Sequence, residues 1–147
     1  MTKIHLLSDI HLEFTKGRFD GYVAPRAKDV DVVILAGDIH PGTTGIMWAG
    51  NTYKKNVPVI YVPGNHEYYG KSIPHHDAKM AKAAADTGNV HLLNNATMEI
   101  AGTRFVCATL WTDMNLRGNA PLDSITAASI MNDYHRIRDD GYGKHWG

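Results

Sequence analysis

Residues 30–38 are Val-Asp-Val-Val-Ile-Leu-Ala-Gly-Asp, a nearly continuous apolar run that closes on a glycine and a carboxylate. Most of its side chains are β-branched or aliphatic, which is typical of a strand buried on both faces of a parallel sheet. The run therefore predicts a strand from Val30 to Ala36, with a polar side chain, Asp38, just beyond its carboxyl end.

Two more strands are predicted around this one. Residues 3–8 alternate polar and apolar side chains, and residues 57–62 form an apolar run that Pro63-Gly64 closes. Residues 46–55 have helical spacing and a basic end, which completes a strand-helix-strand unit of an α/β fold. A second helix is expected over residues 74–87. Further along, the pattern predicts strands at 90–93, 97–100 and 104–110, a helix at 122–131 and a loose segment at 132–147.

Length and composition predict one domain over residues 1–147. The chain is 44% hydrophobic and 20% charged, as in ordinary globular proteins. Its formal net charge is zero and Lys and Arg form no run, so a long nucleic acid is not favoured as a partner. No apolar stretch approaches the ~20 residues of a membrane span, and the start does not resemble a signal peptide. With a single cysteine, Cys107, we expect a cytoplasmic protein that does not enter a membrane.

Each of the first three predicted strands is followed by a polar cluster. The clusters are Asp9-Ile10-His11, Gly37-Asp38-Ile39-His40 and Gly64-Asn65-His66-Glu67. Ligands of open α/β sheets bind just past the carboxyl ends of the strands, so the three clusters should meet at one place. On an extended strand end, Asp9 and His11 would point to the same side. Carboxylates with an imidazole suit a borderline divalent metal.

Other interpretations of these clusters remain open at this stage. Asp38 could be the N-cap of the following helix, a role that Thr43 or Thr44 could equally fill. The Gly-Asn-His-Glu segment could be a simple turn. His40 could face a bound phosphate or lie on the surface.

The three motifs, taken in order, resemble those of the calcineurin-like metallophosphoesterases. That family's pattern begins Asp-x-His, continues with Gly-Asp and then reads Gly-Asn-His-Asp/Glu. The resemblance implies an α/β fold in which two β-sheets form a sandwich flanked by helices (αββα). It also implies an enzyme that hydrolyses a phosphomonoester or phosphodiester, on a small molecule or a phosphoprotein. Two divalent ions, drawn from manganese, iron, zinc and magnesium, would serve as cofactors.

The resemblance assigns a role to each motif residue. Asp9 and His11 would hold the first metal, and Asp38 would bridge both metals. Asn65 would bind the second metal beside the substrate phosphate. His66 would be the catalytic acid that protonates or electrostatically stabilises the leaving oxygen.

Part of the family's pattern does not follow these motifs. After Glu67, which we expect to orient His66 or a nearby ligand, the family continues with a further histidine and a Gly-His-x-His motif. Neither is present. The adjacent His75 and His76 are expected on the solvated surface, and His145 is expected to be disordered.

The missing motifs predict a C-terminally shortened domain. Absent strands would leave sheet edges and apolar faces open, which invites self-association. A homo-oligomer or a second subunit would then complete the site. The alternative function is a catalytically impaired metal-binding or interaction module.

Overall fold

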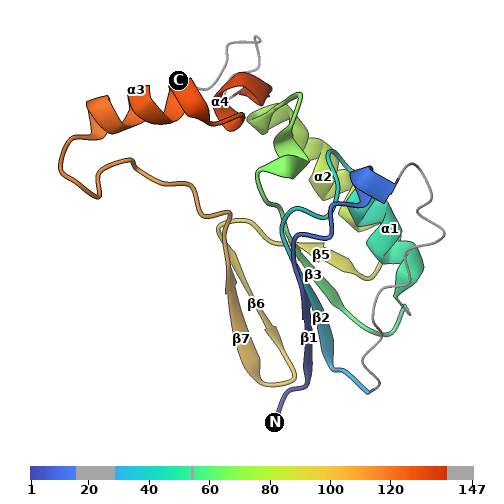
Figure 1. Ribbon diagram of the computed structural model, residues 1–147. Coiled ribbons are helices and arrows are strands. Elements are labelled where there is room, and N and C mark those ends of the chain that lie inside the picture. Colours follow the sequence, from blue (N-terminus) through green and yellow to red (C-terminus); the bar gives the residue numbers. More distant parts are fainter. Residues whose placement is uncertain (16–28, 54, 139–147) are drawn as a thin grey trace.

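A computed structural model describes residues 1–15, 29–53 and 55–138 of the chain. A parallel sheet with the strand order β1-β2-β3-β5 lies at its centre (Figure 1). The strands are β1 (Ile4–Leu7), β2 (Val32–Ala36), β3 (Val59–Val62) and β5 (Val90–Leu92). Each of them falls within a stretch that the apolar pattern predicted. The expected α/β class is therefore confirmed.

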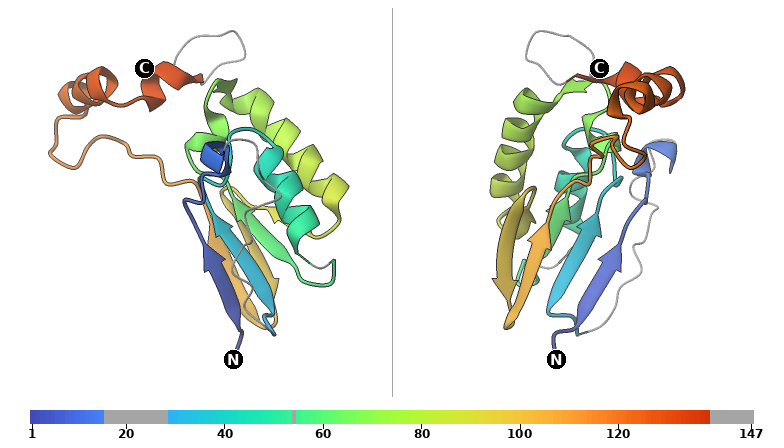
Figure 2. Two further views of the ribbon diagram at one scale, coloured as in Figure 1. Left: turned by 45° about the vertical axis from the view of Figure 1, so that its right-hand side comes forward. Right: turned by 90° about the vertical axis from the view of Figure 1, so that its left-hand side faces the viewer.

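The two faces of the sheet are covered differently. Helices α1 (Thr44–Thr52) and α2 (Ile73–Thr87) pack on one face, and the hairpin of β6 (Ala96–Ile100) and β7 (Thr103–Cys107) lies on the other (Figure 2). Neighbouring strands of the central sheet all pair in parallel. Their carboxyl ends consequently point to the same edge of the sheet.

Alternate residues of β2 enter separate cores. Val33 belongs to a buried cluster with Ile46 of α1 and Met80 of α2, whereas Val32 packs with Phe105 of the hairpin. Consecutive side chains of a strand point to opposite faces, so a strand covered on both sides needs apolar residues at every position. This is why the run in β2 is nearly uninterrupted.

Turn chemistry accounts for two of the element boundaries. Ala101 and Gly102 join β6 to β7 with positive φ angles of 50° and 74°, the left-handed conformation that tight two-residue hairpin turns require. Gly88 ends α2 with a φ of 78°, the usual left-handed end of a helix.

The predicted ends of two segments need correction. β7 ends at Cys107, well short of Leu110, which is exposed. The segment expected to be loose contains α4 (Asp133–Arg136) and β8 (Ile137–Arg138), and β8 pairs in parallel with β4 (Lys71–Ser72). Strands of two residues are too short to give a periodic signal. Residues 139–147, with His145, lie outside the described part of the chain.

The predicted location of His76 also needs correction, because this residue is buried and not on the surface. Its side chain is only 4% exposed, while its neighbour His75 is exposed. His76 stands four and eight residues before Met80 and Ala84, so all three lie on the buried face of α2. Burial lowers the pKa of His76.

Apolar side chains remain open in two places. β1 is an edge strand, and Ile4 and Leu6 on it are 46% and 63% exposed. Helix α3 (Ala120–Ile130) stands away from the sheet in both figures, with Ile125 and Ile130 exposed (Figures 1 and 2). Among the helices of residues 1–15, 29–53 and 55–138, none has the length and apolar character to cross a membrane.

Candidate metal centre

Three of the predicted metal ligands meet at the carboxyl edge of the sheet. Asp9, His11 and Asp38 each offer a ligand atom within 4.8 Å of the others. The loop after β1 is bonded to the loop after β2, since Asp9 N–H donates to the Gly37 carbonyl at 3.1 Å and His11 N–H to the Asp38 carbonyl at 3.0 Å. The structure therefore brings together the residues that the sequence assigned to the first metal.

The geometry behind this meeting differs from the predicted one. β1 ends at Leu7, so Asp9 and His11 do not lie on an extended strand end. Both have left-handed backbones, with φ angles of 52° and 48°, and Asp38 has a φ of 56°. This region is unfavourable for residues other than glycine, and such strain clusters at functional sites where the surrounding structure enforces it.

Asp38 is held from the third loop and does not cap α1. Its Oδ1 accepts the backbone N–H of His66 at 3.0 Å, and the N-cap of α1 is Thr43. Gly64 makes this approach possible, since a Cβ there would clash with Oδ1 and the backbone nitrogen of Asp38. The Gly-Asn-His-Glu segment therefore packs against Asp38 and hydrogen-bonds to it, so it is not a simple turn.

Glu67 ties two of the loops together from beneath the site. It is fully buried, and its Oε2 accepts the backbone N–H groups of Gly64 at 2.8 Å and Asp38 at 3.1 Å. Its Oε1 accepts the Ile39 N–H at 2.9 Å and the Tyr61 hydroxyl at 2.8 Å. Burial, with this carboxylate alongside, raises the pKa of Tyr61. Glu67 therefore supports the site indirectly, and it orients Asp38 and not the ring of His66.

Glu13 is a site residue that the sequence analysis missed. Its Oε1 lies 3.1 Å from Nδ1 of His11 and 3.0 Å from Nδ1 of His66. Burial alone would raise the pKa of Glu13, but its backbone hydrogen bond and the two imidazoles outweigh this effect and lower it. An ionised carboxylate only accepts hydrogen bonds, so both Nδ1 atoms must carry the proton. Nε2 of each ring is then left for a ligand.

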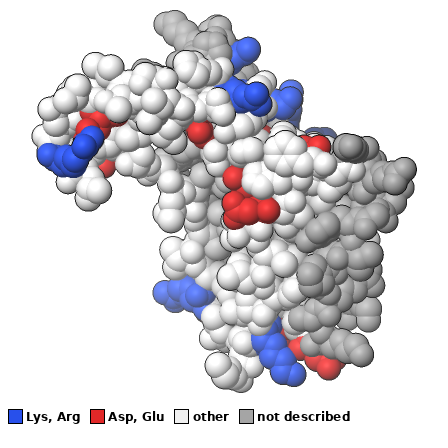
Figure 3. Space-filling view, viewed as in Figure 1, with Lys and Arg blue, Asp and Glu red and all other residues white. Residues whose placement is uncertain are grey.

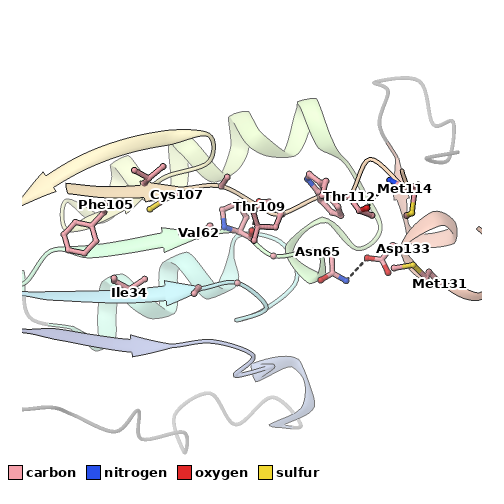
Figure 4. Close-up of a pocket in the computed structure, with 18 of the residues that line it drawn as sticks. Ile34, Val62, Asn65, Phe105, Cys107, Thr109, Thr112, Met114, Met131 and Asp133 are labelled. Carbon is pink, nitrogen blue, oxygen red and sulfur yellow. Dashed lines mark hydrogen bonds between the residues drawn. The ribbon is translucent and has the colours of Figure 1, made fainter. Parts of the chain in front are cut away.

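Asp133 orients Asn65 in the way that Glu13 orients the two imidazoles. The Asn65 Nδ2 group donates to Asp133 Oδ1 at 2.6 Å, shown by the dashed line in Figure 4. Because a carboxylate requires a donor opposite it, the amide is fixed with its Oδ1 free. Asp133 begins α4 and is 8% exposed. Asn65 is thus oriented as the role of neutral oxygen ligand demands.

Two open cavities adjoin the centre. One, of about 620 Å³, runs from Asn65 and Asp133 along the hairpin face of the sheet (Figure 4). The other, of about 460 Å³, begins at His66 and Tyr69, whose rings stack with their centroids 4.3 Å apart. His40 lines neither of them, and its Nδ1 lies 2.6 Å from the Pro41 carbonyl oxygen.

The side chains fit a divalent metal ion. Two carboxylates and one imidazole, with Nε2 of His11 free and 3.9 Å from Asp38 Oδ2, form a donor set that manganese, iron or zinc accepts. For a second ion, the described residues offer Asp38 and the Oδ1 atom of Asn65. The roles of these residues in binding metal and substrate remain predictions.

Comparisons with known proteins agree with this arrangement. The sequence profile described as "Calcineurin-like phosphoesterase" matches residues 2–135. The chain is 26% identical over 163 residues to the uncharacterized protein L509 of Acanthamoeba polyphaga mimivirus, covering 94% of this chain and 52% of that protein. It is 30% identical over 107 residues to an uncharacterized metallophosphoesterase of Helicobacter pylori (strain ATCC 700392 / 26695), covering 68% of this chain and 27% of that protein.

A solved structure has the same fold. The phosphopantetheinyl hydrolase PptH from Mycobacterium tuberculosis superposes with a TM-score of 0.65 at 18% identity, covering 97% of this chain and 57% of that one. The chain spans about half the length of the mimivirus protein and a smaller share of the Helicobacter protein.

Proposed function

The chain belongs to the calcineurin-like phosphoesterase family, and we propose that it is a metal-dependent hydrolase of phosphomonoesters or phosphodiesters with a two-metal site. The observation that carries this proposal is the meeting of Asp9, His11 and Asp38 within 4.8 Å at the carboxyl edge of the sheet. These residues come from the loops after β1 and β2, and the buried Glu67 joins the second of these loops to the loop after β3.

The proposal gives each residue a part that its position supports. Asp9, His11 and Asp38 would hold one ion, and Asp38 with Asn65 would hold a second. Such ions supply an activated water and neutralise the charge that develops on the phosphoryl oxygens. Asp133 holds the amide nitrogen of Asn65, so the Oδ1 atom of Asn65 would be the one to bind the second ion beside the phosphate.

His66 would handle the proton of the leaving oxygen, and its hydrogen bond to Glu13 supports this role. Glu13 holds its Nδ1–H, so Nε2 is the atom that exchanges a proton with the substrate. Tyr69 stacks on the ring and restricts its rotation. The imidazole is therefore oriented before the substrate arrives, which reduces the ordering needed during the reaction.

Manganese is the metal we propose to test first, because carboxylate ligands with one imidazole suit it. Phosphodiester hydrolysis and a cytoplasmic location are part of the same proposal. The location is supported by the lone cysteine, Cys107, which has no partner for an internal disulfide.

A second candidate function is a metal-binding or interaction module with impaired catalysis. It is favoured by the small number of ligands, Asp38 and Asn65, that the described residues give to the second ion. Three protein ligands with an open position still bind one ion well, so such a module would hold metal without turnover.

The deciding experiment is hydrolysis of bis(4-nitrophenyl) phosphate and 4-nitrophenyl phosphate by the chain with manganese. Turnover should be lost in Asp38→Asn and retained in Asp86→Asn, a control that removes an exposed carboxylate of a surface ion pair. His66→Ala should lower turnover about 100-fold while metal binding persists.

The outcomes separate the two functions. Metal binding without turnover in the unmodified chain would favour the impaired module. Turnover that survives Asp38→Asn would show that the activity does not come from this centre.

A further inference from the structure

The cavity beside His66 has a wall of positive charge. It measures about 460 Å³, within the range of small-molecule sites, and Arg136 and Arg138 line it. Phe14 and Pro41 contribute apolar surface on the same cavity. Neither arginine belongs to the motifs of the metal centre.

Short elements fix the position of the two arginines. β8 pairs with β4 next to the loop that carries His66, and the Gly70 N–H donates to the Arg136 carbonyl at 2.7 Å. Ile137 between the arginines is fully buried. Arg136 is the last residue of α4 and Arg138 lies on β8, and both are exposed and line the cavity.

Arg136 is connected to the proposed acid through stacked rings. Its guanidinium carbon lies 5.3 Å from the centroid of the Tyr69 ring, and Tyr69 stacks on His66 at 4.3 Å. A cation over an aromatic face is attracted to it, which restrains the otherwise flexible arginine. The charge of Arg136 is thus held one ring away from His66.

No carboxylate of the described residues, 1–15, 29–53 and 55–138, forms an ion pair with this charge or with that of Arg138. The carboxylate that lines the cavity, Glu13, has its Oε1 occupied by two imidazoles. Figure 3 shows Lys and Arg atoms gathered over α4, with acidic atoms near the strand ends below.

We propose that this cavity is a subsite for a second phosphate group, carried by the leaving half of the substrate. The proposal rests on the proposed function, since it takes the leaving oxygen to lie at His66 and the leaving half to extend beyond it. Arginine is suited to this task because its planar guanidinium binds phosphate oxygens in pairs. The substrate class is then a phosphodiester or phosphoanhydride whose leaving half bears a phosphate.

The subsite can be tested without turnover. In the metal-free chain the carboxylates of Asp9 and Asp38 repel anions, so phosphate binding near His66 reports the arginine wall. The probes are phenyl phosphate and its uncharged analogue phenol, titrated in EDTA and followed by NMR at the imidazole signals of His66 and His135, which both line the cavity. Phenyl phosphate should bind roughly 10-fold more tightly than phenol, the size expected of a charge-assisted hydrogen bond.

Variants identify the group responsible. Arg136→Met, which keeps the aliphatic stem, should remove the preference for phenyl phosphate. Arg138→Met should weaken it. Arg117→Met is the matched control, because it removes the same charge from an exposed position that pairs with Asp123, and it should bind phenyl phosphate like the unmodified chain.

Equal binding of the two probes, or a preference that persists in both Arg136→Met and Arg138→Met, would overturn the subsite. Since no metal is present, this result is independent of hydrolysis. Absence of turnover in the metal-loaded chain would instead count against the proposed function.

Discussion

Two carboxylates outside the recognised motifs hydrogen-bond to the predicted site residues and orient them. Glu13 accepts from Nδ1 of both imidazoles, and Asp133 accepts from the amide of Asn65. In each case the carboxylate accepts a hydrogen bond from a nitrogen atom that would not contact a metal or substrate. The atoms that remain, Nε2 of the rings and Oδ1 of the amide, are the ones with a free lone pair.

Loss of the Glu13 charge should weaken metal binding although Glu13 is not a proposed ligand. In Glu13→Gln the side chain holds the two rings less firmly, and we expect manganese affinity to fall about 10-fold or more. Calorimetric titration of the unmodified chain, of Glu13→Gln and of the exposed Glu99→Gln measures this. Equal affinity in all three would show that the tautomers of His11 and His66 do not depend on Glu13.

These partners illustrate what the sequence could not reveal. The motifs predicted Asp9, His11 and Asp38 because each follows an apolar run that ends at the same edge of the sheet. Glu13 lies 53 residues from His66, and Asp133 lies 68 residues from Asn65, so no local spacing links them. Glu13 stands two residues after His11, but this spacing did not by itself indicate that the carboxylate contacts both imidazoles.

At the level of elements, Glu67 joins the loop after β2 to the loop after β3. Five hydrogen bonds converge on this fully buried carboxylate, from four backbone N–H groups and the Tyr61 hydroxyl. In Glu67→Gln, an amide NH₂ group replaces one carboxylate oxygen, and it cannot accept the hydrogen bonds that this oxygen accepts in the unmodified chain. We expect the free energy of unfolding to fall by about 3 kcal/mol, since hydrogen bonds to a charged acceptor are strong and a buried donor is left unpaired.

Urea unfolding of Glu67→Gln beside Glu99→Gln checks this expectation. Glu99 is exposed on β6, so its substitution should change stability by no more than about 0.5 kcal/mol. If the two variants are equally stable, the loops are not held together through Glu67.

Helix α2 should make the fold sensitive to acid through His76. Burial lowers the pKa of this imidazole in the folded chain, so the unfolded chain binds more protons as the pH falls through about 6.5. Stability is then lost on acidification. Nε2 of His76 has no hydrogen-bond partner among the described residues, which leaves a proton there unsupported.

The Tm of the unmodified chain should therefore drop between about pH 7.5 and about pH 5.5, and the drop should be smaller in His76→Gln. His75→Gln changes the exposed neighbour and should behave like the unmodified chain. A drop that is the same in His76→Gln would place the acid sensitivity elsewhere.

Periodicity predicted the long elements better than the short ones. The apolar runs of β2 and β3 and the start and stop signals of α2 gave elements close to those observed, because packing and end signals agree there. His76 was misplaced because an adjacent pair of histidines was treated as surface, although the positions of Met80 and Ala84 mark the buried face. β4 and β8 are two-residue strands that pair with each other, and the sequence of either segment alone does not indicate this pairing.

At the scale of the whole molecule, the two faces of the sheet differ in how the described residues cover them. Helices α1 and α2 cover one face, whereas the hairpin covers only part of the other. The hairpin packs on β2 and β3 through Phe105, while Ile4 and Leu6 on β1 stay exposed. An edge strand with open apolar side chains favours association with another chain. A second copy or another subunit that completes the site remains a proposal that this exposure supports.

The number of bound ions follows from how the described residues are shared between two positions. In the proposed site Asp9, His11 and Asp38 would hold one ion, whereas the second ion would have only Asn65 and the shared Asp38 among the described residues. We therefore expect calorimetry with manganese to give one tightly bound ion per chain at low protein concentration, and any second ion to bind much more weakly. Asn65→Ala should abolish only binding of the weak ion, and Asp38→Asn should weaken binding of both ions.

A rise to two tightly bound ions as the protein concentration increases would show that association supplies ligands. Two tight ions at every concentration would mean that a single chain completes the second position with groups other than Asp38 and Asn65.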